Sequence, residues 1–230
     1  RGVAAASGDP IVFTDDDCFP ASDFLAAVVS VFADEEVDYF GGRVLLHNPE
    51  DFPVTIKTST RRELAPPRSF VAAGLLHGAN MGFRRRVFDE LGGFNESLGA
   101  GSSVACGEDI ELAARASAHG FLGGYFPEPV VSHCHGRKQD DALELMRGYD
   151  VGRGAYYAAM ILGTNCWRTY LREWVQSMSW KHRRSALREI VGSGIYAWSL
   201  LRARLRGDVL VPRFPVSERR GRDSKPGAWA

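Results

Sequence analysis

The hydrophobic pattern in the first part of the chain centres on a short apolar run followed by three carboxylates. Residues 11–14 are apolar or β-branched, and Asp15, Asp16 and Asp17 follow them directly. Such a run predicts a buried strand, so the acids would lie at its carboxyl end, where open α/β sheets bind ligands. Three adjacent carboxylates repel one another, and a hard divalent cation would compensate them. The alternative is an acidic turn that caps the next helix.

Strands and helices alternate over the rest of the first 138 residues. Apolar runs between turn residues predict strands at 38–46, 81–83, 124–126 and 130–132, and helical spacing predicts helices at 1–7, 24–32, 84–91 and 107–119. The proline-rich connection at 47–68 leaves room for one short helix. This alternation is typical of α/β proteins.

Beyond residue 139 the pattern becomes helical. Residues 140–162 and 167–206 carry apolar side chains at helical spacing, with glycines that we interpret as interruptions. Tryptophan and tyrosine are interleaved with lysine and arginine in the second segment, which would suit the surface of an anionic bilayer. The alternative is that the aromatic side chains pack on the α/β part and the arginines face water. Residues 211–230 are polar and rich in glycine and proline, and we expect a disordered tail.

Composition and charge narrow the protein class. With 45% apolar and 24% charged residues, the 230-residue chain is globular. The formal net charge is zero, but residues 1–180 carry −8 and residues 181–230 carry +8. A basic end on an acidic body indicates contact with an anionic surface or simple solvation. Nothing in the pattern favours nucleic acid as a partner.

Cysteine usage and the lack of targeting signals bear on location. The four cysteines, Cys18, Cys106, Cys134 and Cys166, are widely spaced and form no Cys-x-x-Cys pair, which is typical of a reducing compartment. No signal peptide and no apolar run of about 18 residues is present. We therefore expect a cytoplasmic protein. Because the chain opens with Arg1 inside an apparent helix, we also expect it to be a fragment.

A second pair of carboxylates stands at a predicted helix start. Glu108 and Asp109 follow Gly107, behind a glycine- and serine-rich loop at 98–103 that could close over a substrate. The free amides at a helix start favour a carboxylate. Capping explains one acid there, but two acids less well, so the pair is a candidate for acid-base chemistry.

Several other polar residues are candidates with weaker signals. His133 follows a predicted strand and is either a metal ligand or a structural histidine. The neighbouring positions 133–135 read His-Cys-His, but alternate residues of a strand share a face and no second cluster completes a zinc site. His77 and Asn80 flank a turn and could contact a substrate or bond within that turn.

Taken together, these segments resemble the second half of the GT-A fold glycosyltransferases of family 2. The resemblance covers roughly residues 1–160 and rests on Phe-Thr-Asp-Asp-Asp at 13–17, Gly-Gly-Phe-Asn-Glu at 92–96 and Gly-Glu-Asp-x-Glu-Leu-x-x-Arg at 107–115. It implies an α/β, GT-A-like αβα sandwich that lacks the N-terminal nucleotide-binding βαβ unit and carries a C-terminal helical extension. The implied domains are a partial catalytic domain at 1–138, which holds the metal and acceptor half, and a helical segment at 139–210.

The resemblance also implies a reaction and its residues. A sugar would move from a nucleotide-diphosphate sugar to a hydroxyl of a carbohydrate or lipid-linked acceptor, with Mg²⁺ or Mn²⁺ stabilising the leaving diphosphate. The implied metal ligands are Asp17, Asp15 and His133, and the implied cofactor-binding residues are Asp15 and Asp16. The implied base of an inverting transfer is Asp109, with Glu108 beside it. The implied acceptor-binding residues are His77, Asn80 and Arg115. Without the donor-binding half, we expect poor nucleotide binding.

A further departure and two rival functions qualify this interpretation. The chain lacks the Gln-x-x-Arg-Trp string of processive synthases in the group, which favours addition of a single sugar. The first rival is a nucleotidyltransferase of similar architecture, which also uses acids at strand ends and Mg²⁺. The second is a non-catalytic scaffold with structural Ca²⁺, although a calcium loop would space its ligands at alternate positions around a glycine.

Overall fold

The computed structural model describes residues 2–34, 36–104, 106–180 and 183–211. In this part of the chain the strands are β1 (Ile11–Thr14), β2 (Cys18–Pro20), β3 (Tyr39–Leu46), β4 (Glu63–Ala65), β5 (Asn80–Phe83) and β6 (Gly123–His133). The helices are α1 (Gly2–Ala5), α2 (Phe24–Asp34), α3 (Arg85–Leu91), α4 (Glu108–Ala118), α5 (Gln139–Gly163), α6 (Trp167–Trp180) and α7 (Arg183–Arg206). None of these helices combines the length and apolar character needed to cross a membrane.

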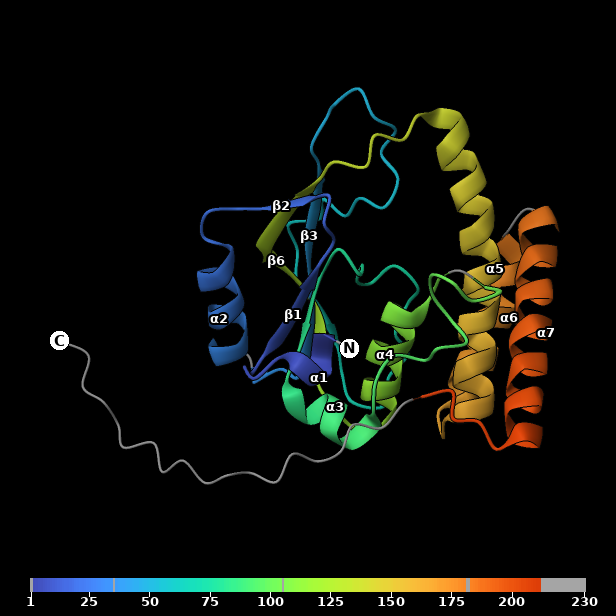
Figure 1. The fold of residues 1–230 in the computed structure, drawn as a ribbon. Helices are drawn as coiled ribbons and strands as arrows, with labels where there is room; N and C mark the ends of the chain where they lie inside the picture. The colour runs from blue at the N-terminus through green and yellow to red at the C-terminus, as the bar shows by residue number, and fades with distance from the viewer. Residues whose placement is uncertain (1, 35, 105, 181–182, 212–230) are drawn as a thin grey trace.

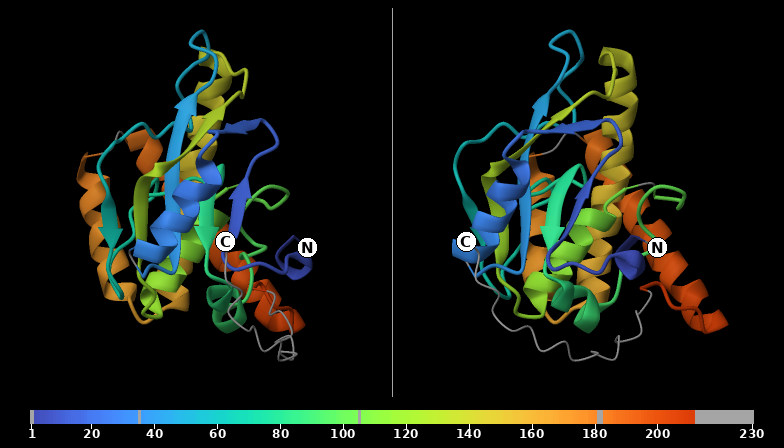
Figure 2. Two further views of the ribbon diagram at one scale, coloured as in Figure 1. Left: turned by 90° about the vertical axis from the view of Figure 1, so that its left-hand side faces the viewer. Right: turned by 60° about the vertical axis from the view of Figure 1, so that its left-hand side comes forward.

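The strands form one mixed sheet between two helical layers. The strand order is β1-β5-β3-β6-β2, with β4 also paired to β6, and only β3 and β6 run parallel. Helix α2 covers one face, and α4 and α5 cover the other, with α6 and α7 outside them (Figures 1 and 2). The predicted α/β architecture and its C-terminal helical extension are thus confirmed. The described chain ends at residue 211, so the predicted tail lies almost wholly outside it.

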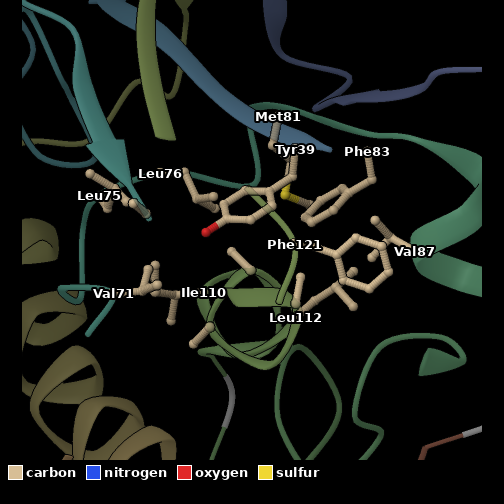
Figure 3. Close-up of a cluster of buried hydrophobic side chains, with 14 of the residues drawn as sticks. Tyr39, Val71, Leu75, Leu76, Met81, Phe83, Val87, Ile110, Leu112 and Phe121 are labelled. Carbon is tan, nitrogen blue, oxygen red and sulfur yellow. The ribbon is translucent and has the colours of Figure 1, made fainter. Parts of the chain in front are cut away.

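Two apolar cores hold the layers together. On the α4 side, Tyr39 and Phe83 of the sheet stack with ring centroids 5.8 Å apart and face Leu112 and Phe121 (Figure 3). On the other side, α2 packs its buried side chains on Phe40 and other residues of the sheet. Burial of this apolar surface is the main favourable term in folding. The sheet is therefore fixed on both faces, and the residues at its strand ends have a rigid support.

The sheet joins two predicted strands into one. The strands expected at 124–126 and 130–132 are a single strand, β6, whose pairing with β3 shifts register between Gly41 and Arg43. At this irregularity the side chain of Asn80 donates hydrogen bonds to the carbonyl oxygens of Arg43 and Pro129, each at 2.9 Å. The amide replaces backbone donors, because the prolines of this segment have no N–H to give.

Short edge strands were not expected, and the connection between β3 and β5 was described wrongly. Strand β2 pairs with the end of β6, and β4 lies within the proline-rich connection, where one short helix was allowed for. The described residues of that connection contain no helix. Both strands have three residues each, so their own sequences carry little signal.

The glycines inside α5 and α7 do not interrupt these helices, which corrects the sequence interpretation, and Gly152, Gly154 and Gly192 are close contact points. Helix α5 runs without a break from Gln139 to Gly163. A Cβ atom added to Gly154 would lie 1.8 Å from the carbonyl oxygen of Glu189, and one on Gly192 would lie 1.9 Å from that of Val151. Only glycine allows α5 and α7 to approach this closely.

We expect Gly154→Ala to destabilise the protein by about 1–3 kcal/mol, because the methyl group forces the two helices apart. The matched control is Gly148→Ala in the same helix, where an added Cβ meets no atom within 4 Å. Alanine favours helix there, so the control should be neutral or up to about 1 kcal/mol more stable. Chemical denaturation of both variants measures the difference, and equal stabilities would contradict the packing role.

Candidate active site

The turn from β1 into β2 and the end of β6 bring four possible metal ligands together. Strand β1 ends at Thr14, and the chain turns through Asp15 and Asp17 into β2, which places Cys18 opposite His133 on β6. The turn is closed by a hydrogen bond from the amide of Cys18 to the carbonyl oxygen of Asp15. One ligand atom from each of Asp15, Asp17, Cys18 and His133 lies within 4.8 Å of the others.

The geometry of this group fits a shared cation. His133 is buried, and its Nε2 atom lies 3.2 Å from Oδ1 of Asp17. This carboxylate oxygen is buried without a hydrogen-bond partner. A buried oxygen without a hydrogen bond is costly unless something compensates it. Carboxylate oxygens with one imidazole nitrogen are donors that divalent cations such as Mn²⁺ accept.

The raised pKa of Asp15 reflects the negative charge that is concentrated at this group. Burial raises the pKa of this carboxyl, and the negative charge of Asp17 raises it further. The Asp15 carboxyl also acts on the second acidic pair, because its charge adds to the rise in the pKa of Glu108 and of Asp109. The two acidic groups predicted from separate parts of the chain therefore lie within electrostatic reach of each other.

The start of α4 presents the second acidic pair. Gly107 precedes the helix at φ 107°, a left-handed conformation that suits glycine, and Glu108 and Asp109 form the first turn. Oδ2 of Asp109 accepts a hydrogen bond from the Gly78 amide at 2.9 Å, and Oδ1 accepts one from the Ile110 amide at 2.7 Å. These bonds fix the carboxylate at the helix start. Burial nevertheless raises its pKa, and burial is also the largest cause of the raised pKa of Glu108.

One cavity joins the two groups. It has a volume of about 530 Å³, and Asp15, His133, His77, Glu108 and Asp109 all line it. A hollow of about 440 Å³ on the other side of the acids shares Asp15, Glu108 and Asp109 with the first and is walled by aromatic residues of the β1 region. The cavity is therefore large enough for a sugar-sized ligand beside both the possible metal ligands and the second acidic pair.

Three candidates from the sequence lie elsewhere. Asn80 is fully buried and bridges β3 and β6, as described above. Arg115 is buried in an ion pair with Glu111, and it donates hydrogen bonds to the carbonyl oxygens of Leu91 and Gly93, both at 2.7 Å. Neither residue lines the cavity, and both are engaged within the fold. Asp16 is exposed and stands outside the group of four possible ligands.

The sequence reasoning missed one wall of the cavity and one possible ligand. The wall comes from α5, whose residues Leu145, Tyr149, Gly152, Arg153 and Tyr156 recur at helical spacing on the cavity side. That spacing was visible in the sequence, but the direction of the face was not. The missed ligand is Cys18, which pairs with His133 across β2 and β6 and joins the group.

The chain matches a protein-family model described as "Glycosyltransferase like family 2" over residues 1–148. Two curated O-antigen chain rhamnosyltransferases are also similar. RfbN of Salmonella typhimurium (strain LT2) is 28% identical over 164 residues, which cover 66% of this chain and 50% of the relative. WbaN of Salmonella anatum is 28% identical over 159 residues, which cover 65% of this chain and 48% of the relative. The chain thus spans about half the length of the curated relatives it matches.

Two solved structures have a similar backbone arrangement. The mannosyltransferase PcManGT from Pyrobaculum calidifontis, in complex with GDP-Man and Mn²⁺, has a TM-score of 0.49 and 18% identity, with 89% of this chain and 62% of that chain covered. TarS of S. aureus (residues 1–349) has a TM-score of 0.48 and 12% identity, with 74% of this chain and 48% of that chain covered.

Proposed function

The chain belongs to the glycosyltransferase-like family 2, and from this premise we propose that it moves a sugar from a nucleotide-diphosphate sugar to a hydroxyl acceptor with the help of a divalent cation. The observation that carries the proposal is the shared cavity. Asp15 and His133 of the metal-ligand group line this cavity together with the carboxylates of Glu108 and Asp109. This supports a cation that stabilises the leaving group and a carboxylate base beside the same cavity.

We assign the cation to Asp15, Asp17 and His133, and either Mn²⁺ or Mg²⁺ would suit the two carboxylates. Bound there, the ion would neutralise the charge that develops on the leaving diphosphate. His133 is held by its burial in the β6 strand end, and its Nδ1 atom lies 3.5 Å from Oγ1 of Thr55. Asp15, with Asp16 beside it, is the residue we propose to face the nucleotide.

We propose Asp109 as the base. In an inverting transfer, one carboxylate takes the proton of the acceptor hydroxyl while the oxygen attacks the sugar carbon on the face opposite the leaving group. Asp109 is positioned by two backbone amides, and burial raises its pKa toward a range useful for proton transfer. Glu108 stands beside it and packs under the loop at Gly99. We propose that Glu108 orients the acceptor or this loop.

His77 is our remaining candidate for the acceptor side. Its side chain lines the cavity, and burial together with the positive charge of Lys57 lowers the pKa of His77 to about 4. The imidazole is therefore neutral near pH 7, with one nitrogen to donate and one to accept a hydrogen bond. A neutral imidazole that both donates and accepts a hydrogen bond suits a sugar hydroxyl. A diphosphate would be bound better by a positively charged group.

The wider setting is proposed on the same basis. We propose a GT-A-like catalytic domain over residues 1–138 and a helical segment over 139–210, in a cytoplasmic enzyme that adds a single sugar. The two curated relatives are named as O-antigen chain rhamnosyltransferases. This supports a carbohydrate or lipid-linked acceptor in the synthesis of a cell-envelope polysaccharide.

The test is turnover of a panel of nucleotide-diphosphate sugars by the protein expressed from its native start codon. We expect release of nucleoside diphosphate with Mn²⁺ or Mg²⁺, and loss of turnover in EDTA that excess metal restores. Release of pyrophosphate from a nucleoside triphosphate would instead favour a nucleotidyltransferase. Metal-independent turnover would contradict the role of the acidic group.

A further inference from the structure

Helix α7 carries a continuous apolar row on its exposed side. Its large members are Leu187, Ile190, Val191, Trp198, Leu201 and Leu205, which are between 46% and 78% exposed. Gly194 and Ala197 fill the gap in this row, and both are exposed. The members follow one another at intervals of three or four residues, so they share one face of the helix. We call this row the apolar face of α7.

The orientation of this face is fixed by the opposite side of the helix. Glu189, Gly192, Tyr196 and Ala203 are buried there. The close approach of Gly154 and Gly192 to the neighbouring backbone leaves α7 no freedom to roll on α5. Figures 1 and 2 place α7 on the outside of the molecule, across the sheet from α2. Among the described residues, nothing packs over the apolar face of α7.

The charged side chains that α7 shows on its surface are all positive. Helix α7 contains six arginines and one glutamate, a net charge of +5. The glutamate, Glu189, is buried and bonded to Arg153 and Trp174, so α7 shows no acidic side chain on its surface. Arg202 lies over the Trp198 ring with its guanidinium carbon 5.1 Å from the centroid. A long cation on an interfacial tryptophan can reach outward while the ring stays in apolar surroundings.

We propose that the apolar face of α7 docks on an anionic phospholipid bilayer, with the helix lying in the plane of the membrane surface. Apolar side chains flanked by arginines, without acids between them, match the boundary between acyl chains and negatively charged headgroups. A second copy of the chain fits less well. A two-fold contact would bring the same arginine-rich face against itself, which like charges oppose.

This docking would place the proposed active site next to the lipid. Helix α5 lies between α7 and the cavity, with Tyr149 on the cavity side and Gly154 against α7. One helix diameter, about 10 Å, then separates the membrane-bound helix from the cavity wall. If the proposed function holds, a lipid-linked acceptor is the substrate class that this arrangement favours. The docking itself does not depend on that function.

Co-sedimentation with vesicles tests the proposal on the full chain. We expect binding to vesicles of phosphatidylcholine with a third of phosphatidylglycerol, weak binding to phosphatidylcholine alone, and release at high salt. Trp198→Glu with Leu201→Glu should weaken the binding to anionic vesicles by about tenfold or more. The matched control is Leu25→Glu with Val29→Glu on α2, an even more exposed apolar pair across the sheet from α7, and it should bind like the wild type.

A second variant guards against misfolding of the first. Trp198→Phe keeps the face apolar and should still bind. Fluorescence quenching by brominated lipid should fall, because the indole that inserts into the lipid is gone. Failure of the wild-type chain to bind anionic vesicles would overturn the proposal. So would a concentration-dependent dimer that Trp198→Glu with Leu201→Glu abolishes while vesicle binding persists. Vesicle binding without sugar transfer would support the docking proposal and contradict only the proposed function.

Discussion

Replacing Asp109 by asparagine is expected to lower the rate of sugar transfer by about 10²–10⁴-fold, the usual contribution of a positioned base. The amide cannot take up the proton of the acceptor hydroxyl. Asp109 does not belong to the group of four possible metal ligands, so Mn²⁺ binding should be retained. The measurement is the rate of product formation at saturating donor and acceptor, together with Mn²⁺ affinity.

The pH dependence provides a second readout of the same variant. Burial raises the pKa of Asp109, and the base works only when it is deprotonated. The wild-type rate should therefore fall as the pH drops through this raised pKa, and the residual rate of Asp109→Asn should lack that fall. Asp140→Asn is a matched control, because Asp140 is an exposed acid in the first turn of α5. Wild-type activity in Asp109→Asn would remove the assigned base and make Glu108 the next residue to replace.

Loss of one metal ligand should have the largest effect on cation binding. We expect Asp17→Asn or His133→Ala to weaken Mn²⁺ binding by about a hundredfold or more, since even residues that only support metal ligands are worth ten- to a hundredfold. The Asp17 oxygen and the His133 nitrogen lie 3.2 Å apart, so either change removes one proposed ligand atom from the metal-ligand group. Isothermal titration with Mn²⁺ measures the affinity without requiring turnover.

The control for this pair is Asp23→Asn, which removes the same charge from an exposed position just before α2. It should leave Mn²⁺ affinity within about twofold of the wild type, because a solvent-exposed charge at a distance is largely screened. If Asp17→Asn and Asp23→Asn bind Mn²⁺ equally well, the acidic turn is a cap and not a metal site.

The sequence predicted those parts of the fold whose signal is local. The strand at Ile11–Thr14 and the helix behind Gly107 depend on neighbouring residues, which set their hydrophobic period and their ends. Strand β3 was placed within one residue for the same reason. The two acidic groups could be named from the sequence because each follows such an element.

Long-range pairing decided the parts that could not be predicted. Strand β2 exists because β6 lies beside it, and β6 continues past its prolines because Asn80 supplies donors from another strand. The same contacts changed the interpretation of Asn80 and Arg115, whose polar side chains suggested substrate contacts but are used inside the fold. The α5 wall of the cavity was also hidden, since helical spacing gives a face but not the partner it meets.

The central claim is that one cation binds between Asp15, Asp17 and His133 and faces Asp109 across the cavity. Anomalous diffraction from crystals soaked in Mn²⁺ tests this claim most directly. The account predicts one strong peak within coordination distance of Asp17 and His133, beside the cavity that Asp109 lines. A peak elsewhere, or none at these residues while Mn²⁺ supports turnover, would contradict it.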